Sequence, residues 1–365
     1  HMRVLFVFAV VVGVFASVAG PLDGGAVAQS PRLPRGLTAV RGIKVGHFTL
    51  TERPTGCTVV LAERGAVAGV DVRGASPGTR ETDLLNPVNA VEQVHAVVIA
   101  GGSAFGLDAA SGVVRYLDEK GVGFKIGRAT VPIVPAAILI DLEVGASEKI
   151  RPTAECGYRA AQSATDGEVQ GTIDGNVGAG AGATVGKLAG FGRGMKGGLA
   201  EASMTIPTGL TVAALVAVNT VGDVIDPESG RVIAGVRTPD GSAIEDIKAL
   251  VRSGTRPRGA VGGNTTLGIV VTNATLTKAQ ATKVAQMAQD GYARVIYPSH
   301  TMFDGDTIFA LATGESRAET GATTVADVST IGALAADMVS EAIVRAVRSA
   351  TSIPGYPAAR DMAPR

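Results

Sequence analysis

The chain has 365 residues, and its 33 Lys and Arg residues are balanced by 33 Asp and Glu residues, so its formal net charge is zero. This length fits one large domain or two ordinary ones, and 49 glycines with 46% hydrophobic residues are typical of a closely packed sheet protein. Aromatic residues make up only 4% of the chain and no long basic run occurs, which argues against nucleic-acid binding through a charged patch or a stacking surface.

The N-terminus has the pattern of a secretory signal peptide. His1 resembles a cloning remnant, Arg3 supplies a positive start, and residues 4–19 form an apolar run that small residues follow. We expect cleavage after Ala19 or after Ala28. The run is shorter than the about 20 apolar residues that a spanning helix needs, so an uncleaved membrane anchor is the less favoured alternative. The protein is therefore expected to be exported, to a periplasm or beyond, without stable membrane insertion once the signal is removed.

Hydrophobic periodicity predicts a mixture of strands and helices along the rest of the chain. Strands are predicted at Thr58–Leu61, Ala66–Val72, Ala96–Ala100, Leu210–Val218, Leu267–Val271 and Thr307–Ala312. Helices are predicted at Ala104–Glu119, Cys156–Ala164, Ile244–Arg252, Lys278–Tyr292 and Val325–Ala350. The two kinds of element alternate irregularly, which favours a layered α+β fold over a doubly wound sheet.

The two cysteines, Cys57 and Cys156, have no catalytic motif around them. One disulfide between them is possible in an exported chain. Cys57 lies in a strand pattern at residues 55–61, and a buried free thiol is the preferred interpretation there.

The most informative motif is Gly263-Asn264-Thr265-Thr266. Glycine allows backbone conformations that other residues resist, so the Thr265 hydroxyl can reach the carbonyl of Asn264, one peptide back. Cleavage there would make Thr265 a new N-terminus that carries both a hydroxyl nucleophile and an α-amine as its base. An ordinary turn is the alternative for these residues taken alone. The same region contains Asp304 and Asp306, which directly precede a predicted strand.

Five segments, in order along the chain, resemble a family of self-cleaving N-terminal-nucleophile amidohydrolases. They are Gly101–Leu107, Val134–Asp141, Gly182–Lys187, Val216–Asn219 and Gly263–Gly314. The family includes L-aminopeptidase/D-esterase enzymes, β-peptidyl aminopeptidases and nylon-oligomer (6-aminohexanoate oligomer) endo-hydrolases. The resemblance spans roughly residues 36–350. It implies an αββα sandwich with the nucleophile strand in the middle.

The resemblance also implies roles for individual residues. Thr265 matches the nucleophile, and the chain would cut itself between Asn264 and Thr265. Asp304 and Asp306 match a pair that accepts hydrogen bonds from the nucleophile's hydroxyl and amine. Lys187 matches a lysine close to the nucleophile, whose charge favours ionised carboxylates. Asn219 matches a side-chain amide donor to the oxyanion.

The branches of the family differ at several of these positions. A threonine nucleophile and an aspartate pair resemble the nylon-oligomer branch, since the aminopeptidase branch has Ser at the nucleophile and tends to have Ser and Glu at the pair. Ile140 departs from several relatives, which have Tyr immediately before the residue that matches Asp141, in contact with substrate or oxyanion. This substrate-binding position therefore lacks a donor, which leaves the substrate open.

Competing motifs fail on physical grounds. Gly74–Gly78 has the spelling of a serine-hydrolase elbow, but the residue after the serine is Pro77, which has no N–H to offer the oxyanion. His47, His95 and His300 show no metal-ligand spacing. Two other classes stay open: an unprocessed binding protein of the same fold, and a metal-dependent hydrolase whose cation is held by the aspartate pair.

We therefore predict a signal peptide at residues 1–28, an α chain at 29–264 and a β chain at 265–365. The enzyme is predicted to hydrolyse amide bonds of small peptides, amino-acid amides or linear ω-amino-acid oligomers through an acyl-threonine intermediate. Aminopeptidase specificity remains the alternative to endo-hydrolysis. No cofactor and no metal are expected. The resemblance implies a homo-oligomer of αβ units, either a dimer or a tetramer.

Overall fold

The computed structural model describes residues 36–166, 174–256, 263–315 and 325–362. Residues 1–28, predicted as a signal peptide, lie outside the described residues. Within the described ranges, no helix is both long and apolar enough to cross a membrane.

Strands and helices alternate in the irregular order that the periodicity predicts. The longer strands are β1 (Lys44–Thr49), β2 (Gly56–Val72), β4 (Gln93–Ala100), β10 (Gly198–Thr205), β11 (Thr211–Val218), β14 (Leu267–Thr272) and β16 (Thr307–Ala312). The shorter strands are β3 (Thr79–Arg80), β5 (Phe124–Ile126), β6 (Ala129–Val131), β7 (Ala136–Ile138), β8 (Thr184–Val185), β9 (Met195–Lys196), β12 (Asp223–Ile225), β13 (Val232–Ala234) and β15 (Ile296–Tyr297). The α-helices are α1 (Ala109–Glu119), α2 (Ala154–Ser163), α3 (Ile247–Arg252), α4 (Lys278–Ala288), α5 (Asp290–Val295) and α6 (Val325–Ser349).

The main sheet is continuous, with the order β10-β11-β14-β16-β2-β4-β7-β3 and with β1 paired to β2. Its longest strand, β2, was predicted as two strands. The structure joins them, and the ladder with β4 has an irregularity between Leu61 and Ala66. The first part of β2 pairs with β1, and residues 67–72 pair with β16. The strand therefore belongs to both halves of the sheet.

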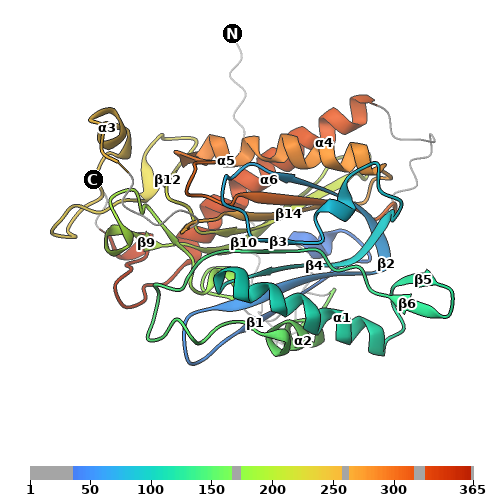
Figure 1. The fold of residues 1–365 in the computed structure, drawn as a ribbon. Coiled ribbons are helices and arrows are strands. Elements are labelled where there is room, and N and C mark those ends of the chain that lie inside the picture. The colour runs from blue at the N-terminus through green and yellow to red at the C-terminus, as the bar shows by residue number, and fades with distance from the viewer. Residues whose placement is uncertain (1–35, 167–173, 257–262, 316–324, 363–365) are drawn as a thin grey trace, which may run out of the picture. The chain divides into compact units, whose positions relative to one another are not determined.

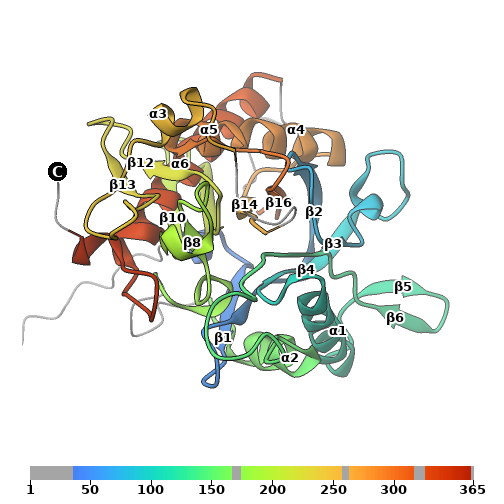
Figure 2. The same ribbon diagram turned by 60° about the vertical axis from the view of Figure 1, so that its left-hand side comes forward.

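The two halves of the sheet pack face to face between two layers of helices. Figures 1 and 2 show α4, α5 and α6 on one side of the strands and α1 and α2 on the other. Strand β11 shows how the layers form, because alternate residues point to opposite faces of a strand. Val212, Ala214 and Val216 join the cluster under α4–α6, whereas Ala213 and Leu215 join the cluster between the two half-sheets.

Side chains from the remaining strands fill the central cluster and a third cluster. The central cluster also contains Ile269 of β14, Phe309 of β16 and Val60 of β2. A third cluster, which includes Val59 and Val113, lies between β2, β4 and the helices α1 and α2. Three apolar layers separated by two half-sheets make an αββα sandwich, so the predicted fold class is confirmed.

Three helix boundaries differ from the predictions, and at one of them a side chain caps the backbone. The helix predicted from Ile244 begins instead as α3 at Ile247, because the Asp246 carboxylate accepts hydrogen bonds from Lys248 N and Ala249 N at 2.8 and 3.2 Å. The segment predicted as one helix from Lys278 to Tyr292 is divided into α4 and α5 at Gln289. The helix predicted from Ala104 begins with a 3-10 turn, Ser103–Asp108, before α1.

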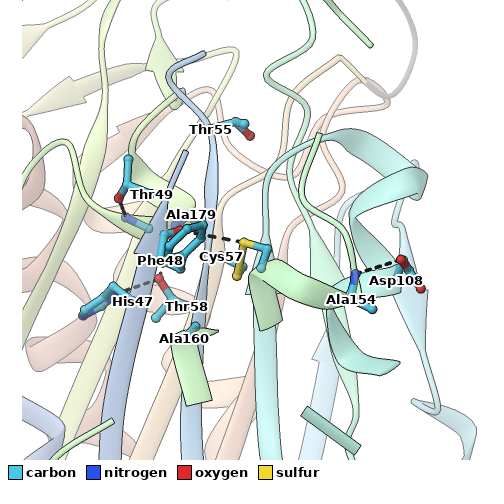
Figure 3. The surroundings of a disulfide bond; sticks show 12 residues. His47, Phe48, Thr49, Thr55, Cys57, Thr58, Asp108, Ala154, Ala160 and Ala179 are labelled. Atoms are coloured by element: carbon cyan, nitrogen blue, oxygen red, sulfur yellow. Dashed lines mark hydrogen bonds between the residues drawn. A yellow bond between two sulfur atoms is a disulfide. The ribbon is translucent and has the colours of Figure 1, made fainter. Parts of the chain in front are cut away.

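The prediction of a free thiol at Cys57 is wrong. Cys57 and Cys156 form a disulfide that joins the start of β2 to α2 (Figure 3). Both residues are buried, as predicted for Cys57. The strand pattern indicated burial correctly. It contained no information about α2, which packs against β1 and β2 from a position 99 residues further along the chain.

Candidate functional site

The pairing of β14 with β16 brings the two halves of the predicted site together. These strands are parallel and in register, with Leu267 opposite Thr307. Continuing that register backwards places residues 264–266 beside residues 304–306, and a β-bridge between Asn264 and Asp304 confirms the alignment. The motif that precedes one strand and the carboxylates that precede the other therefore share one end of the sheet.

The Thr265 hydroxyl lies against the peptide that it is predicted to cut. Thr265 is buried, and its Oγ1 donates a hydrogen bond to the carbonyl oxygen of Asn264. Its backbone N–H donates to the carbonyl of Asn219 at 2.7 Å. The nucleophilic oxygen is thus next to the Asn264 carbonyl group, and the leaving nitrogen is held by the residue that follows the neighbouring strand, β11.

The carbonyl of Asn264 has a donor aimed at its oxygen. The backbone N–H of Gly305 donates to this oxygen at 3.0 Å. A Cβ added to Gly305 would lie 2.6 Å from both Thr265 Oγ1 and the carbonyl oxygen of Ser76, so only glycine fits. A preorganised N–H at this place stabilises the negative charge that develops when the carbonyl is attacked.

Asp306 connects the nucleophile segment to the loop before β16. One oxygen, Oδ1, accepts a hydrogen bond from the Thr266 N–H at 2.8 Å. The other, Oδ2, accepts from the backbone N–H of His300 at 3.1 Å and lies 2.9 Å from His300 Nδ1. The carboxylate is buried, and its two oxygens are directed to different segments.

Asp304 is held in a similar way, and its environment disfavours the charged form. Its Oδ1 accepts from Val221 N at 3.3 Å, and its Oδ2 accepts from the N–H and hydroxyl of Thr301 at 3.0 and 2.5 Å. Burial, followed by the nearby charge of Asp306, raises the pKa of Asp304 to about 6. Asp304 therefore changes its charge close to neutral pH.

Lys187 and Asn219 form the opposite wall of the site. The Lys187 ammonium is fully buried, and its Nζ donates to Asn219 Oδ1 at 2.8 Å. Asn219 Oδ1 also accepts from Thr184 N at 3.0 Å. Burial lowers the pKa of Lys187 to about 7, although the charges of Asp304 and Asp141 act in the opposite direction.

Ile140 contributes to the site through its backbone carbonyl. Its carbonyl accepts a hydrogen bond from Asn219 Nδ2 at 3.0 Å, and its side chain is half-buried. The amide predicted to be an oxyanion donor is therefore oriented by this carbonyl. The substrate-binding role of the Ile140 side chain stays a prediction.

A buried ion pair that the sequence analysis missed anchors this wall. Asp141 Oδ1 lies 2.8 Å from Arg53 Nη2, and neither side chain is exposed. Asp141 also accepts from Thr55 Oγ1 at 2.6 Å and from Gly102 N at 2.9 Å. Arg53 donates in addition to the backbone carbonyls of Asp141 and Val144. The pair ties together three segments next to Ile140.

Gly305, His300 and Thr301 were also missed as parts of the site. The sequence Asp304-Gly305-Asp306 could have indicated a role for Gly305, since a glycine between two functional carboxylates suggests a close approach of the backbone. No local signal marked His300, whose contact with Asp306 depends on how residues 298–304 fold.

Two other features lie outside this constellation. A cavity of about 430 Å³ beside the disulfide is lined by Phe48, Thr49, Leu50, Thr51, Glu52, Arg151, Thr153, Glu155, Cys156 and Arg159, none of which is a predicted site residue. In the described part of the chain, no group of three or more His, Cys, Asp and Glu side chains is arranged to hold a metal ion.

Comparisons with known proteins agree over nearly the whole described chain. The family model described as peptidase family S58 matches residues 36–360. An uncharacterized aminopeptidase of Mycobacterium leprae is 43% identical over 347 residues, which cover 88% of this chain and 92% of that protein. A 6-aminohexanoate-oligomer endohydrolase of Kocuria sp. is 29% identical over 328 residues, or 84% of each chain.

Solved structures show the same fold at lower sequence identity. A beta-aminopeptidase of Burkholderia sp. superposes with a TM-score of 0.63 at 23% identity, over 88% of both chains. The L-aminopeptidase D-Ala-esterase/amidase of Ochrobactrum anthropi, described as a variant of the Ntn hydrolase fold, gives a TM-score of 0.64 at 19% identity and the same coverage.

Proposed function

Because this chain belongs to peptidase family S58 and is an amide-hydrolysing enzyme of the N-terminal-nucleophile hydrolase fold, we propose that Thr265 is its nucleophile and becomes the N-terminus of a β chain by self-cleavage. The observation that carries this proposal is the contact between Thr265 Oγ1 and the Asn264 carbonyl, whose oxygen also receives the Gly305 N–H. The α chain would then comprise residues 29–264 and the β chain residues 265–365.

Self-cleavage follows from this geometry in two steps. Thr265 Oγ attacks the carbonyl carbon of Asn264, and the Gly305 N–H stabilises the oxyanion. Before the attack the hydroxyl donates to the Asn264 carbonyl and not to a carboxylate, so we propose that its proton is transferred to Asp304 or Asp306 as the new bond forms. The C–N bond to Thr265 breaks as its nitrogen takes up a proton, which leaves an ester on Oγ. Water then hydrolyses this ester and gives a carboxylate at Asn264 and a free amine at Thr265.

Turnover of a substrate repeats the same chemistry with a new base. The free α-amine of Thr265 takes the hydroxyl proton, because its ordinary pKa of about 7.7–8.0 is close to neutral. An acyl-threonine ester forms, the substrate's amine leaves, and water releases the acid. Gly305 N–H and the Asn219 amide would stabilise the oxyanion. Asp304 Oδ1 and Asp306 Oδ1 each accept one N–H in the described structure, so each oxygen keeps a lone pair for the proton transferred during self-cleavage. The metal-dependent hydrolase stays the alternative.

The rate of self-cleavage is expected to depend on pH in a bell shape. The uncut chain has no α-amine at Thr265, so the pH dependence of self-cleavage reports only the titration of side chains. The rate should rise through pH about 6, as Asp304 ionises, and fall above about 7, as Lys187 loses its charge. Fragment formation can be followed at a series of pH values after refolding. Asp304→Asn should slow cleavage, because an amide cannot accept the proton, and the residual rate should lack the acidic limb. A wild-type rate independent of pH would contradict these assignments.

We further propose that the substrates are small peptides, amino-acid amides or linear ω-amino-acid oligomers. The relative with 43% identity is named an aminopeptidase, which supports a requirement for a free amine, whereas the aspartate pair resembles the endo-hydrolase branch. Kinetics on a free and an N-acetylated form of the same peptide and of a 6-aminohexanoate oligomer separate the two. We expect acetylation to abolish turnover. Undiminished cleavage of the acetylated oligomer would indicate an endo-hydrolase instead.

Export and assembly remain proposals of the same kind. The disulfide between Cys57 and Cys156 supports export, because such bonds persist in oxidising compartments. N-terminal sequencing of the protein from the source cell tests cleavage after Ala19 or Ala28. Light scattering of the processed enzyme tests whether it is a dimer or a tetramer.

A further inference from the structure

His300 contacts the site from the loop that precedes Asp304, and its own side chain has no assigned role. Its backbone N–H and its ring Nδ1 both approach the same oxygen, Asp306 Oδ2, at 3.1 and 2.9 Å. About four-fifths of its side chain is buried, since the exposed fraction is 19%. One residue thus supplies both contacts to that oxygen.

The backbone of His300 is held in a conformation that L-residues avoid. Its φ angle is +56°, in the left-handed region, which is strained for a residue with a Cβ. Such strain persists only where the surroundings over-determine it, and it often occurs at functional sites. In this conformation the N–H and the ring can reach the same oxygen of Asp306.

The ring is also held from its other side. The centroid of Tyr292, from α5, lies 5.8 Å from that of His300, and Tyr292 is fully buried. The Tyr292 hydroxyl in turn lies 3.3 Å from the carbonyl oxygen of Thr266. Asp306 and Tyr292 are two titratable groups that approach the ring, and both also contact Thr266.

With Oδ2 occupied by His300, Asp306 presents only Oδ1 to the nucleophile segment, where it accepts the Thr266 N–H at 2.8 Å. We propose that His300 is a positioning residue that fixes the rotation of the Asp306 carboxylate and so aligns Thr265 for attack. This inference rests on the proposed function, because it assigns His300 to the chemistry of Thr265.

Two substitutions separate the side-chain donor from the backbone strain. His300→Asn keeps a residue that tolerates the left-handed region and places an amide N–H near the position of Nδ1. His300→Gly relieves the strain but removes the donor. Glu81→Gly is the control for relief of strain, because Glu81 is an exposed residue with the same φ of +56°, and its side chain accepts a hydrogen bond from Val134 N at 3.3 Å rather than from a site residue.

We expect His300→Gly to slow both self-cleavage and kcat by about 10- to 100-fold, the loss that a misaligned reacting group causes. KM should change little, because the proposed role of His300 is to position Asp306 and not to bind substrate. His300→Asn should recover most of both rates, and Glu81→Gly should match wild type. If the glycine variant does not fold, His300→Asp decides the question, because it has the shape of asparagine but places a carboxylate against Asp306.

The outcomes distinguish this inference from the proposed function. Wild-type rates in His300→Gly, or an asparagine variant as slow as the glycine or aspartate variant, would overturn the positioning role. The role of Thr265 would stand if Thr265→Ala alone abolished cleavage in the same experiment. If wild type itself formed no fragment beginning at Thr265, the proposed function would fail and the assignment of His300 with it.

Discussion

Replacement of Thr265 with Ala is expected to leave the chain uncut between residues 264 and 265. Wild type should instead release a fragment of 101 residues, since 365 − 264 = 101. The alanine variant lacks the oxygen that lies against the Asn264 carbonyl, so no ester can form. Intact mass spectrometry of both proteins measures this directly. Amide hydrolysis should fall by at least about 10³-fold in the variant, as when other hydrolases lose their nucleophile.

Two further variants are controls for the loss of self-cleavage in Thr265→Ala. Thr265→Ser retains a hydroxyl and should still release the fragment, whereas Thr208→Ala, in an exposed turn, should behave as wild type. A fragment of the same mass from the alanine variant would show that another protease makes the cut. A wild-type chain that stays intact under several incubation conditions would remove the N-terminal-nucleophile mechanism and favour the unprocessed binding protein.

Replacement of Arg53 with Met is expected to be the most damaging change outside the nucleophile. It leaves the Asp141 carboxylate buried without its cationic partner. Breaking a buried pair in this way costs about 3–5 kcal/mol in the free energy of unfolding. Denaturant titration measures this loss, and the Thr265→Ala background keeps every variant a single chain. Activity should also fall in the processed enzyme, because Asp141 follows Ile140, whose carbonyl orients Asn219.

Matched variants test whether the loss comes from the unpaired charge. Removing both charges, as Arg53→Met with Asp141→Leu, should recover part of the stability, because no charge is then left buried alone. Arg294→Met breaks the ion pair with Asp337, whose side chains are about half exposed, and should cost less than about 1 kcal/mol. Equal losses at the buried and the exposed pair would contradict the electrostatic explanation.

The sequence alone predicts the local parts of this molecule well. The strands β14 and β16 have apolar runs that could be placed to within one residue. The site positions chosen by motif come together because each lies directly before or after such a strand. Thr265 is an example, since the register of two parallel strands places it beside Gly305, between Asp304 and Asp306.

The missed features are those that join distant segments. Arg53 meets Asp141 across 88 residues, and Cys57 meets Cys156 across 99. Neither partner has a neighbour in sequence that predicts the other, since tertiary packing alone brings them together. His300 was missed for a different reason. Its function depends on a left-handed backbone and on the path of one loop, and neither leaves a periodic pattern.

The order of the strands has a consequence for the life of the processed enzyme. Strands β14 and β16 come after the proposed cut, but their outer neighbours, β11 and β2, come before it. The cut precedes β14 and breaks none of these ladders, while the disulfide joins two residues of the α chain and leaves the β chain untethered. Processing would therefore turn one chain into two that are interleaved without a covalent link. Unfolding would let them diffuse apart, and recovery would then depend on protein concentration, so the mature enzyme's lifetime would be set by how slowly it opens.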